Sequence, residues 1–304
     1  MYIEHFGLRE APFALTPDTE YYFGTDSHRQ ALNVLLVALE SGEGFIKIAG
    51  EVGTGKTLLC RKLLTSLPER MVSAYLPNPL LSPLELHKAL AEELGLEVAQ
   101  GATLHELRGR LQQTLIDLAA AGNRVIVCVD EAQAMPDASL EALRLLSNLE
   151  TEKRKLLQIV LFAQPELDER LRQPGLRQLR QRLVHSFKLV PLCREGVANY
   201  IGHRLLVAGF QGGGLFRRRT IDLIFQASGG VPRLVNILSH KALLVAYGQG
   251  ARMIDRQHVL AAIRDTEDAA LRYKPLVPFL YGGVGMVLAL EIWLLVYLLR
   301  GGTL

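Results

Sequence analysis

A glycine-rich loop is the first part of the sequence that can do chemistry. The segment Gly50-Glu-Val-Gly-Thr-Gly-Lys56-Thr57 fits the pattern G-x-x-x-x-G-K-[ST]. In this pattern the backbone N–H groups surround phosphate oxygens, the lysine reaches the β- and γ-phosphates, and the hydroxyl binds Mg²⁺. A β-rich run at 44–50 and a helical run at 58–67 enclose it, which makes a chance glycine turn the weaker interpretation. The sequence therefore predicts a site for ATP and Mg²⁺ at Gly50, Glu51, Val52, Gly53, Thr54, Gly55, Lys56, Thr57 and Leu58.

Two adjacent carboxylates, Asp130 and Glu131, end an apolar run of strand length at 124–130. At the C-terminal edge of a parallel sheet, such side chains lie where phosphates bind. We expect Asp130 to hold Mg²⁺, mainly through water, and Glu131 to polarise the attacking water. Acids at strand ends are common, and the pairing with the glycine-rich loop is what favours a catalytic role.

Three further features are weaker on spacing alone. Gln164 follows the apolar strand 158–162 and either orients water or is a turn residue before Pro165. Arg233 begins a helix and is either a surface charge or a contact to the γ-phosphate. Three arginines recur at regular spacing before the last predicted strand. These are either a solvated helix face or, in a ring-forming ATPase, the source of an arginine finger: Arg177, Arg180 and Arg182.

Strands alternating with helices must position these residues, which predicts an α/β fold with a parallel sheet and right-handed crossovers. Two capping boxes, at Ser82–Glu85 and Thr103–Glu106, mark helix starts. The predicted strands are 44–50, 72–76, 124–130, 158–162 and 185–189. After Pro191 the strand signal fades, and a small helical domain is expected with helices at 196–208, 219–227, 232–247 and 255–265.

Length and composition narrow the class of protein. The 304 residues predict about two domains, and 49% hydrophobic residues exclude a disordered chain. A net charge of +3 lacks the clustered basic excess that indicates nucleic acid binding. Three scattered cysteines and eight histidines without ligand spacing argue against a disulfide framework and a zinc site.

An apolar segment of 24 residues, 276–299, contains Glu291 as its one ionisable residue. As a helix it would extend ~36 Å, enough to cross a ~30 Å hydrocarbon core, so we expect a transmembrane helix rather than a buried helix of the helical domain. Glu291 would then face a partner or snorkel to the interface. The N-terminus lacks the features of a signal peptide, and Arg272 and Lys274 precede the segment, which places the globular part on the cytoplasmic side.

Taken together, these motifs resemble the AAA+ ATPases of secretion and pilus assembly, the ExeA/GspA-like group. The resemblance includes Phe162-Ala-Gln-Pro-Glu-Leu-Asp-Glu, Arg180-Gln-Arg182 and Gly230-Val-Pro-Arg233 and covers about residues 1–270. Within the group, the segments beginning at Gly42, Asn148 and Asp265 are most similar to the ATPases of mannose-sensitive haemagglutinin (MSHA) type IV pilus biogenesis.

The resemblance implies a role for each candidate residue. Lys56 and Thr57 belong to Walker A, and Asp130 and Glu131 to Walker B. It further implies that Gln164 is sensor 1, Arg182 the arginine finger and Arg233 sensor 2. Many AAA+ proteins carry asparagine at sensor 1, so Gln164 departs from the common pattern.

We therefore expect an AAA+ P-loop ATPase domain at 45–190, preceded by a segment at 1–44 that packs on the nucleotide site, followed by a helical lid at 191–270 and a membrane anchor. Its expected partners are further copies of the chain, the bacterial inner membrane, and pilus or secretion assembly proteins. No specific nucleic acid is expected. Two alternatives stay open: a DNA-directed AAA+ ATPase of the transposition-helper type, and a nucleotide-gated scaffold with little turnover.

Overall fold

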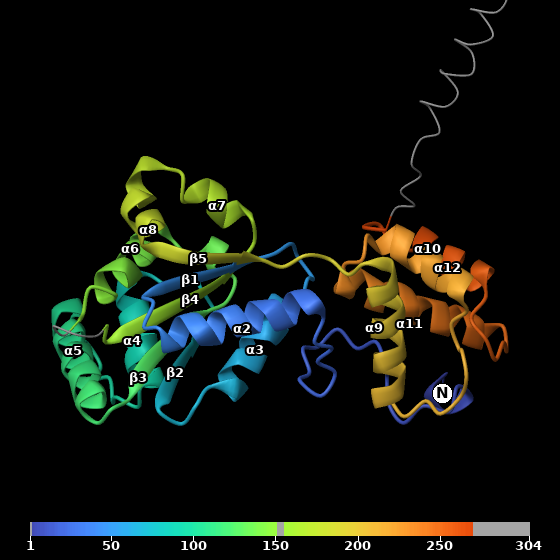
Figure 1. Ribbon diagram of the computed structural model, residues 1–304, viewed down its shortest axis with the longest axis horizontal. Coiled ribbons are helices and arrows are strands. Elements are labelled where there is room, and N and C mark those ends of the chain that lie inside the picture. The colour runs from blue at the N-terminus through green and yellow to red at the C-terminus, as the bar shows by residue number, and fades with distance from the viewer. Residues whose placement is uncertain (1, 151–154, 270–304) are drawn as a thin grey trace, which may run out of the picture. The chain divides into compact units, whose positions relative to one another are not determined.

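A five-stranded parallel sheet is the centre of the computed structural model, which describes residues 2–150 and 155–269. The strand order is β2-β3-β4-β1-β5, and every neighbouring pair is parallel. All five predicted strands and the parallel sheet are thereby confirmed (Figure 1). The strands are β1 Phe45–Ala49, β2 Met71–Leu76, β3 Arg124–Val129, β4 Leu157–Ala163 and β5 Leu183–Lys188.

The inner strands are apolar on both sides because helices cover both faces of the sheet. In β3, Val127 packs with the helices on one face, and its neighbours Ile126 and Cys128 pack with those on the other. One face is covered by α2 (Asp26–Glu40) and α3 (Lys56–Ser66). The other face is covered by α4 Pro83–Glu93, α5 Leu104–Ala120, α6 Asp137–Leu146 and the short elements η1 Ala132–Ala134, α7 Glu166–Arg170, η2 Pro174–Leu176 and α8 Arg177–Arg182.

Both predicted capping boxes are present, at the starts of α4 and α5. The Ser82 hydroxyl accepts from the N–H of Glu85, and the Glu85 carboxylate accepts from the N–H of Ser82. Thr103 and Glu106 make the same reciprocal pair. Each box satisfies two backbone donors that a helix start leaves without partners, which fixes where each helix begins.

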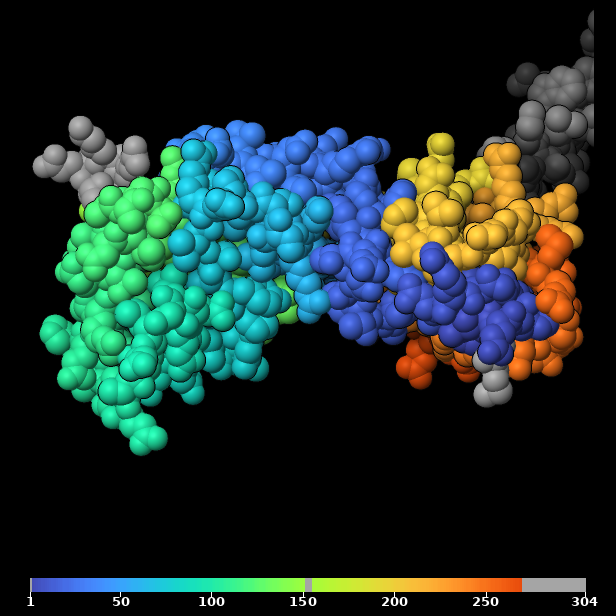
Figure 2. Space-filling view, turned by 90° about the horizontal axis from the view of Figure 1, so that it is seen from below, coloured from blue at the N-terminus to red at the C-terminus, as the bar shows by residue number. Residues whose placement is uncertain are grey.

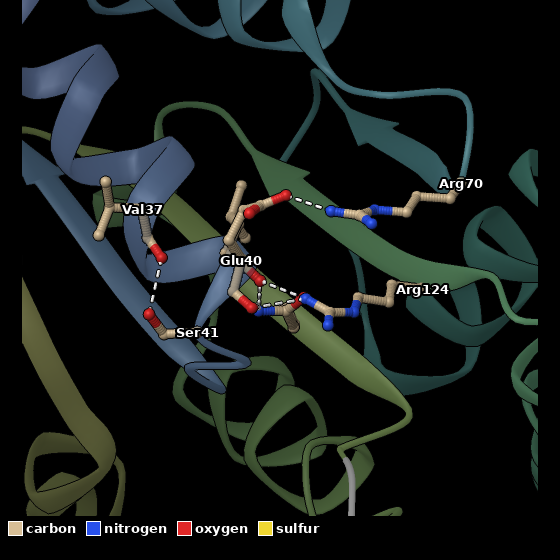
Figure 3. A network of polar contacts seen from close by, with 7 residues as sticks. Val37, Glu40, Ser41, Arg70 and Arg124 are labelled. Carbon is tan, nitrogen blue, oxygen red and sulfur yellow. Dashed lines mark hydrogen bonds and ion pairs between the residues drawn. The ribbon is translucent and has the colours of Figure 1, made fainter.

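Helix α2 was not among the predicted helices, although its sequence carries the signal. Thr25 caps its first turn by accepting from the N–H of His28. Its C-terminal end lies over the start of β3, where the Arg124 guanidinium donates to the carbonyl of Glu40 at 2.7 Å and Arg70 forms an ion pair with the Glu40 carboxylate (Figure 3). Positive side chains at a helix C-terminus satisfy free carbonyls, so this contact anchors α2 to the sheet.

A bundle of four helices follows the sheet, as the sequence predicts. Ile201, Ile224, Val235 and Leu238 form part of its core and are at most 1% exposed. We call this bundle the lid. Its helices are α9 Arg194–Val207, α10 Arg218–Ser228, α11 Pro232–Gly248 and α12 Arg256–Arg264.

Residues 2–25, which we call the N-terminal arm, pack on the lid. The short helix α1 (Tyr2–His5) contacts α11, and the N–H of Arg9 donates to the carbonyl of Ala208 at 2.8 Å. The ring of Phe13 meets that of Phe216 edge-on. Figure 2 shows these dark blue residues lying across the yellow and orange surface of the lid. The first residues of the chain therefore belong to the packing of its helical part.

Among the residues that the structure describes, no helix combines the length and the apolarity needed to cross a bilayer. The predicted segment 276–299, with Glu291, lies outside those residues.

Candidate nucleotide-binding site

The glycine-rich loop connects β1 to α3 and curls around its own lysine. Gly53 and Gly55 have φ of +78° and +93°, the left-handed region that glycine adopts without strain. The Lys56 ammonium donates to the carbonyls of Gly50 and Glu51 at 2.9 and 3.2 Å. No side chain caps α3, so the N–H groups of its first turn stay available to an anion.

Close packing around the loop leaves room for glycine alone at two points. A Cβ on Gly50 would lie 2.7 Å from the Thr54 hydroxyl, and a Cβ on Gly53 would lie 2.5 Å from the Cβ of Arg233. Both distances are below van der Waals contact, so the glycines of the motif are needed for close approach as well as for backbone conformation.

Lys56 is a buried cation, with 4% of its surface exposed. Burial lowers the pKa of its ammonium, while the nearby Glu131 and Asp130 carboxylates act in the opposite direction. A buried charge that rests on main-chain carbonyls is well placed to exchange them for phosphate oxygens.

Thr57 and Asp130 meet at the end of β3. The Thr57 hydroxyl donates to Asp130 at 2.7 Å, and Asp130 is 4% exposed. Hydroxyl and carboxylate oxygens are the ligands that Mg²⁺ takes in phosphate-binding sites of this kind. The residues present therefore fit a magnesium ion, which Thr57 and Asp130 would hold.

Glu131 has an unusual backbone. Its φ of +50° is the one positive value at a non-glycine residue among those described. One carboxylate oxygen, Oε2, accepts from the side-chain amides of Gln164 at 2.9 Å and Gln133 at 2.5 Å. Burial raises the pKa of this carboxyl, but the two amide donors and Lys56 outweigh it and hold the pKa below its usual value. Glu131 is thus an ionised, oriented carboxylate next to the loop.

A cavity over the loop brings together three parts of the chain. The loop and Glu131 line one side of it, and Arg233 with Asn236 from α11 lines another. The N–H of Arg233 donates to the carbonyl of Gly53 at 3.2 Å, so the start of α11 touches the loop. The N-terminal arm lines a further side with residues 14–18, Tyr22 and Phe23, and Tyr200 and Arg204 of α9 and His28 of α2 also line the cavity.

None of the three arginines of α8 lines this cavity in its own chain. Arg177 and Arg180 are exposed. Arg182 is half-buried, and its guanidinium donates to the Ser147 hydroxyl at 3.1 Å. The structure thus brings Lys56, Thr57, Asp130, Glu131, Gln164 and Arg233 together and leaves the α8 arginines apart from them.

Among the site residues that the sequence analysis missed, two contact its motifs directly. Gln133 contacts both Glu131 and the main chain of Gln164. His28, 7% exposed in α2, contacts the Thr25 hydroxyl at 2.7 Å and packs against Gly55. Gln133 stands two residues after Glu131, a position that could have suggested it. His28 gives no such signal, because only the fold brings α2 to the loop.

Residues 39–171 match a family model described as an AAA domain. Over 254 residues the chain is 42% identical to general secretion pathway protein A of Aeromonas hydrophila, which covers 84% of this chain. The chain spans about half of that relative, with 46% of its length matched.

Solved structures share the fold. The ORC2 protein of Aeropyrum pernix, in its ADPNP–ADP complexes, has a TM-score of 0.64 at 16% identity and covers 86% of this chain and 73% of its own. The RuvB Holliday junction branch migration motor of Thermotoga maritima has a TM-score of 0.52 at 15% identity, with 82% and 73% covered. Together with the loop geometry, these matches show that the chain has an α/β P-loop AAA fold and is similar in sequence to general secretion pathway protein A.

Proposed function

We propose that the chain is a magnesium-dependent ATPase. The observation that carries the proposal is the oriented Glu131 carboxylate beside a glycine-rich loop whose buried Lys56 donates to two main-chain carbonyls. Bound Mg²⁺ would neutralise phosphate charge. Gly50 to Leu58 bind the phosphates of ATP, and Thr57 and Asp130 would hold the ion. Glu131 accepts a proton from the attacking water as the water oxygen bonds to the γ-phosphorus, and ADP leaves with the bridging oxygen. Gln164 and Arg233 contact the γ-phosphate side of the site.

Two substitutions test this function with a matched control. Lys56→Ala removes the cation that meets the phosphates and is expected to abolish nucleotide binding. Glu131→Gln keeps the shape of the side chain and is expected to bind ATP but hydrolyse it at least ~10²-fold more slowly. Glu97→Gln, the same change at an exposed residue remote from the loop, should match the wild type. Equal turnover in Glu131→Gln and wild type would refute the role of Glu131.

We infer that the ATPase acts at the bacterial inner membrane in the assembly of a type IV pilus or a related secretion machine. The identity to a protein named for general secretion supports this setting. The segments at Gly42, Asn148 and Asp265 resemble MshM-type ATPases, which favours an MSHA-like pilus. The apolar segment 276–299 supplies the anchor, and Glu291 within it pairs with a partner's polar group.

Fractionation and purification test the cellular setting. The full chain should stay in membranes after carbonate and high-salt washing, and it should copurify with pilus or secretion proteins. Release by carbonate would refute the anchor. Unchanged partner recovery with Glu291→Leu would refute the pairing role alone. Tight, salt-dependent binding to duplex DNA would instead favour the DNA-directed alternative. ATP binding without measurable turnover would favour the nucleotide-gated scaffold.

A further inference from the structure

Gln133 lies between the two polar side chains that follow β3 and β4. Its amide nitrogen donates to Oε2 of Glu131 at 2.5 Å, and its amide oxygen accepts from the main-chain N–H of Gln164 at 2.9 Å. The Gln164 side chain closes the triangle by donating to the same Glu131 oxygen at 2.9 Å. One amide therefore connects Glu131, the second residue after β3, to Gln164, the first residue after β4.

The backbone of Gln133 is held in place by Arg170, the last residue of α7. The Arg170 guanidinium donates to the carbonyl of Gln133 and, at 2.7 Å, to that of Met135, and it forms an ion pair with Asp137. These three contacts extend from Gln133 in η1 to Asp137, the first residue of α6. Helix α7, which follows Gln164, thus holds η1, which follows Glu131, in place.

Helix α7 is itself attached to the sheet. Lys47, a buried residue of β1, forms an ion pair with Asp168 in the middle of α7. A buried cation with a single carboxylate partner resists separation, because an unpaired charge would remain in the core. The position of Arg170, and through it the position of Gln133, is consequently set by the sheet.

The contacts of Gln133 and Gln164 hold Glu131 in its strained backbone conformation. A left-handed backbone at a residue with a side chain is strained and persists only where surrounding contacts enforce it. Gln133 and Gln164 both donate to Oε2, and no described residue donates to Oε1, which is the oxygen that would accept a proton. A carboxylate held in this way keeps one orientation towards the loop.

We propose that Gln133 is a positioning residue for the reaction: it orients the Glu131 carboxylate and ties it to Gln164. This inference rests on the proposed ATPase function. A turn glutamine that only satisfies local hydrogen bonds would make the same contacts, so the test must separate the two roles. Gln133 is half-buried, and a substitution there should leave the fold intact.

The experiment compares Gln133→Met with Gln113→Met in the full-length protein, in wild-type and Glu131→Gln backgrounds. Met keeps the length of the side chain and removes both amide contacts, whereas Gln113 is an exposed residue of α5. We expect Gln133→Met to lower kcat at least ~10-fold, with KM for ATP, nucleotide affinity and thermal midpoint unchanged. In the Glu131→Gln background the same substitution should change kcat less than ~2-fold, because a residue that acts through Glu131 has nothing left to orient.

A second variant keeps the test sharp. Arg170→Lys keeps the charge but cannot reach two carbonyls and Asp137 together, and it should reproduce part of the loss of kcat. Unchanged kcat in Gln133→Met would refute the role of Gln133, as would an equal loss in both backgrounds. Absence of turnover in the wild type would overturn the proposed function and this inference with it. If the wild type hydrolyses ATP but Gln133→Met lowers kcat by the same factor with and without Glu131→Gln, the inference alone would be overturned.

Discussion

The two walls of the nucleotide cavity are built in different ways. On the sheet side, Lys56, Asp130 and Glu131 stand at the ends of neighbouring elements, and each belongs to a short motif. On the arm and lid side, contacts join residues far apart in the chain: Arg204 of α9 meets Pro12 and Ala14 of the arm. The residues expected to act on phosphate therefore lie in short sequence motifs, whereas the residues that enclose the cavity come together only in the folded chain.

Arg204 is the centre of the second wall. It is 5% exposed, donates to the carbonyls of Pro12 and Ala14 and to the Tyr200 hydroxyl, and lies 4.5 Å from the centroid of the Tyr21 ring. No ion pair among the described residues includes it. Carbonyls and aromatic faces therefore stabilise this charge, and they come from both the arm and the lid.

The largest effect expected concerns an arginine that we predict a neighbouring subunit to supply to the cavity. Because the α8 arginines lie outside the cavity, we predict that Arg182 acts on a neighbouring subunit. Arg182→Ala should bind ATP normally and lose hydrolysis by ~10³-fold, the scale of a missing arginine finger. Mixing it with Lys56→Ala should restore part of the activity, since each variant lacks a different half of the shared site.

Arg177→Ala and Arg180→Ala serve as comparisons, because both side chains are exposed on the same helix. A loss confined to one of these two would move the role from Arg182 to that residue. Full activity in a strictly monomeric preparation would contradict a shared site altogether.

Much of the first wall was predictable from the sequence, and the reason is physical. The glycine-rich loop and the acids after β3 need only a strand and a helix on either side to reach their places, and periodicity predicts both. For the second wall, the sequence analysis predicted that residues 1–44 pack on the nucleotide site and that Arg233 reaches it, but not the contacts that assemble the wall. Nothing in the spacing of Arg204, His28 or Phe13 shows that the arm packs on the lid or that α2 lies under the loop, because those contacts arise from tertiary packing.

The next largest effect is expected at Gly53, where the glycine-rich loop contacts Arg233 of α11. Gly53→Ala would place a Cβ 2.5 Å from that of Arg233, in addition to the strain of φ at +78°. We expect ~10- to 100-fold weaker ATP binding, from ~1–3 kcal/mol of combined strain and overlap. Gly122→Ala is the matched control, because Gly122 has φ of +85° and open space around it. Equal ATP affinity in the two variants would mean that α11 does not need to touch the loop.

A smaller effect is expected at Arg204. Arg204→Met fills similar volume but leaves the carbonyls of Pro12 and Ala14 without donors, so it should lower the free energy of unfolding by ~2 kcal/mol. Denaturant unfolding measures this, and limited proteolysis should show earlier cleavage within the arm. Arg194→Met removes an exposed arginine that pairs with Asp222 and should lower the free energy of unfolding by less than ~1 kcal/mol. Equal losses would mean that Arg204 does not hold the arm.

The smallest effect is a dependence on pH that involves both walls. Burial lowers the pKa of His28 beside the loop, although a hydrogen bond with the main chain of Thr54 opposes this, and burial likewise lowers the pKa of His203 and His240 in the lid. The folded chain therefore favours the neutral form of these three histidines, and burial likewise lowers the pKa of His87 in α4. Below the ordinary pKa of 6.5 the unfolded chain binds protons more readily, so stability is fully present above that pH and is lost as pH falls.

We predict a lower free energy of unfolding at pH ~5 than at pH ~7.5, measured with urea at constant ionic strength. His28→Gln should flatten this dependence in part, because Gln cannot titrate but can still bind the Thr25 hydroxyl. His105→Gln, at an exposed histidine of α5, should leave the slope unchanged. A slope that is the same in all three proteins would remove His28 from the acid sensitivity and leave it to the other histidines whose pKa burial lowers, His87, His203 and His240.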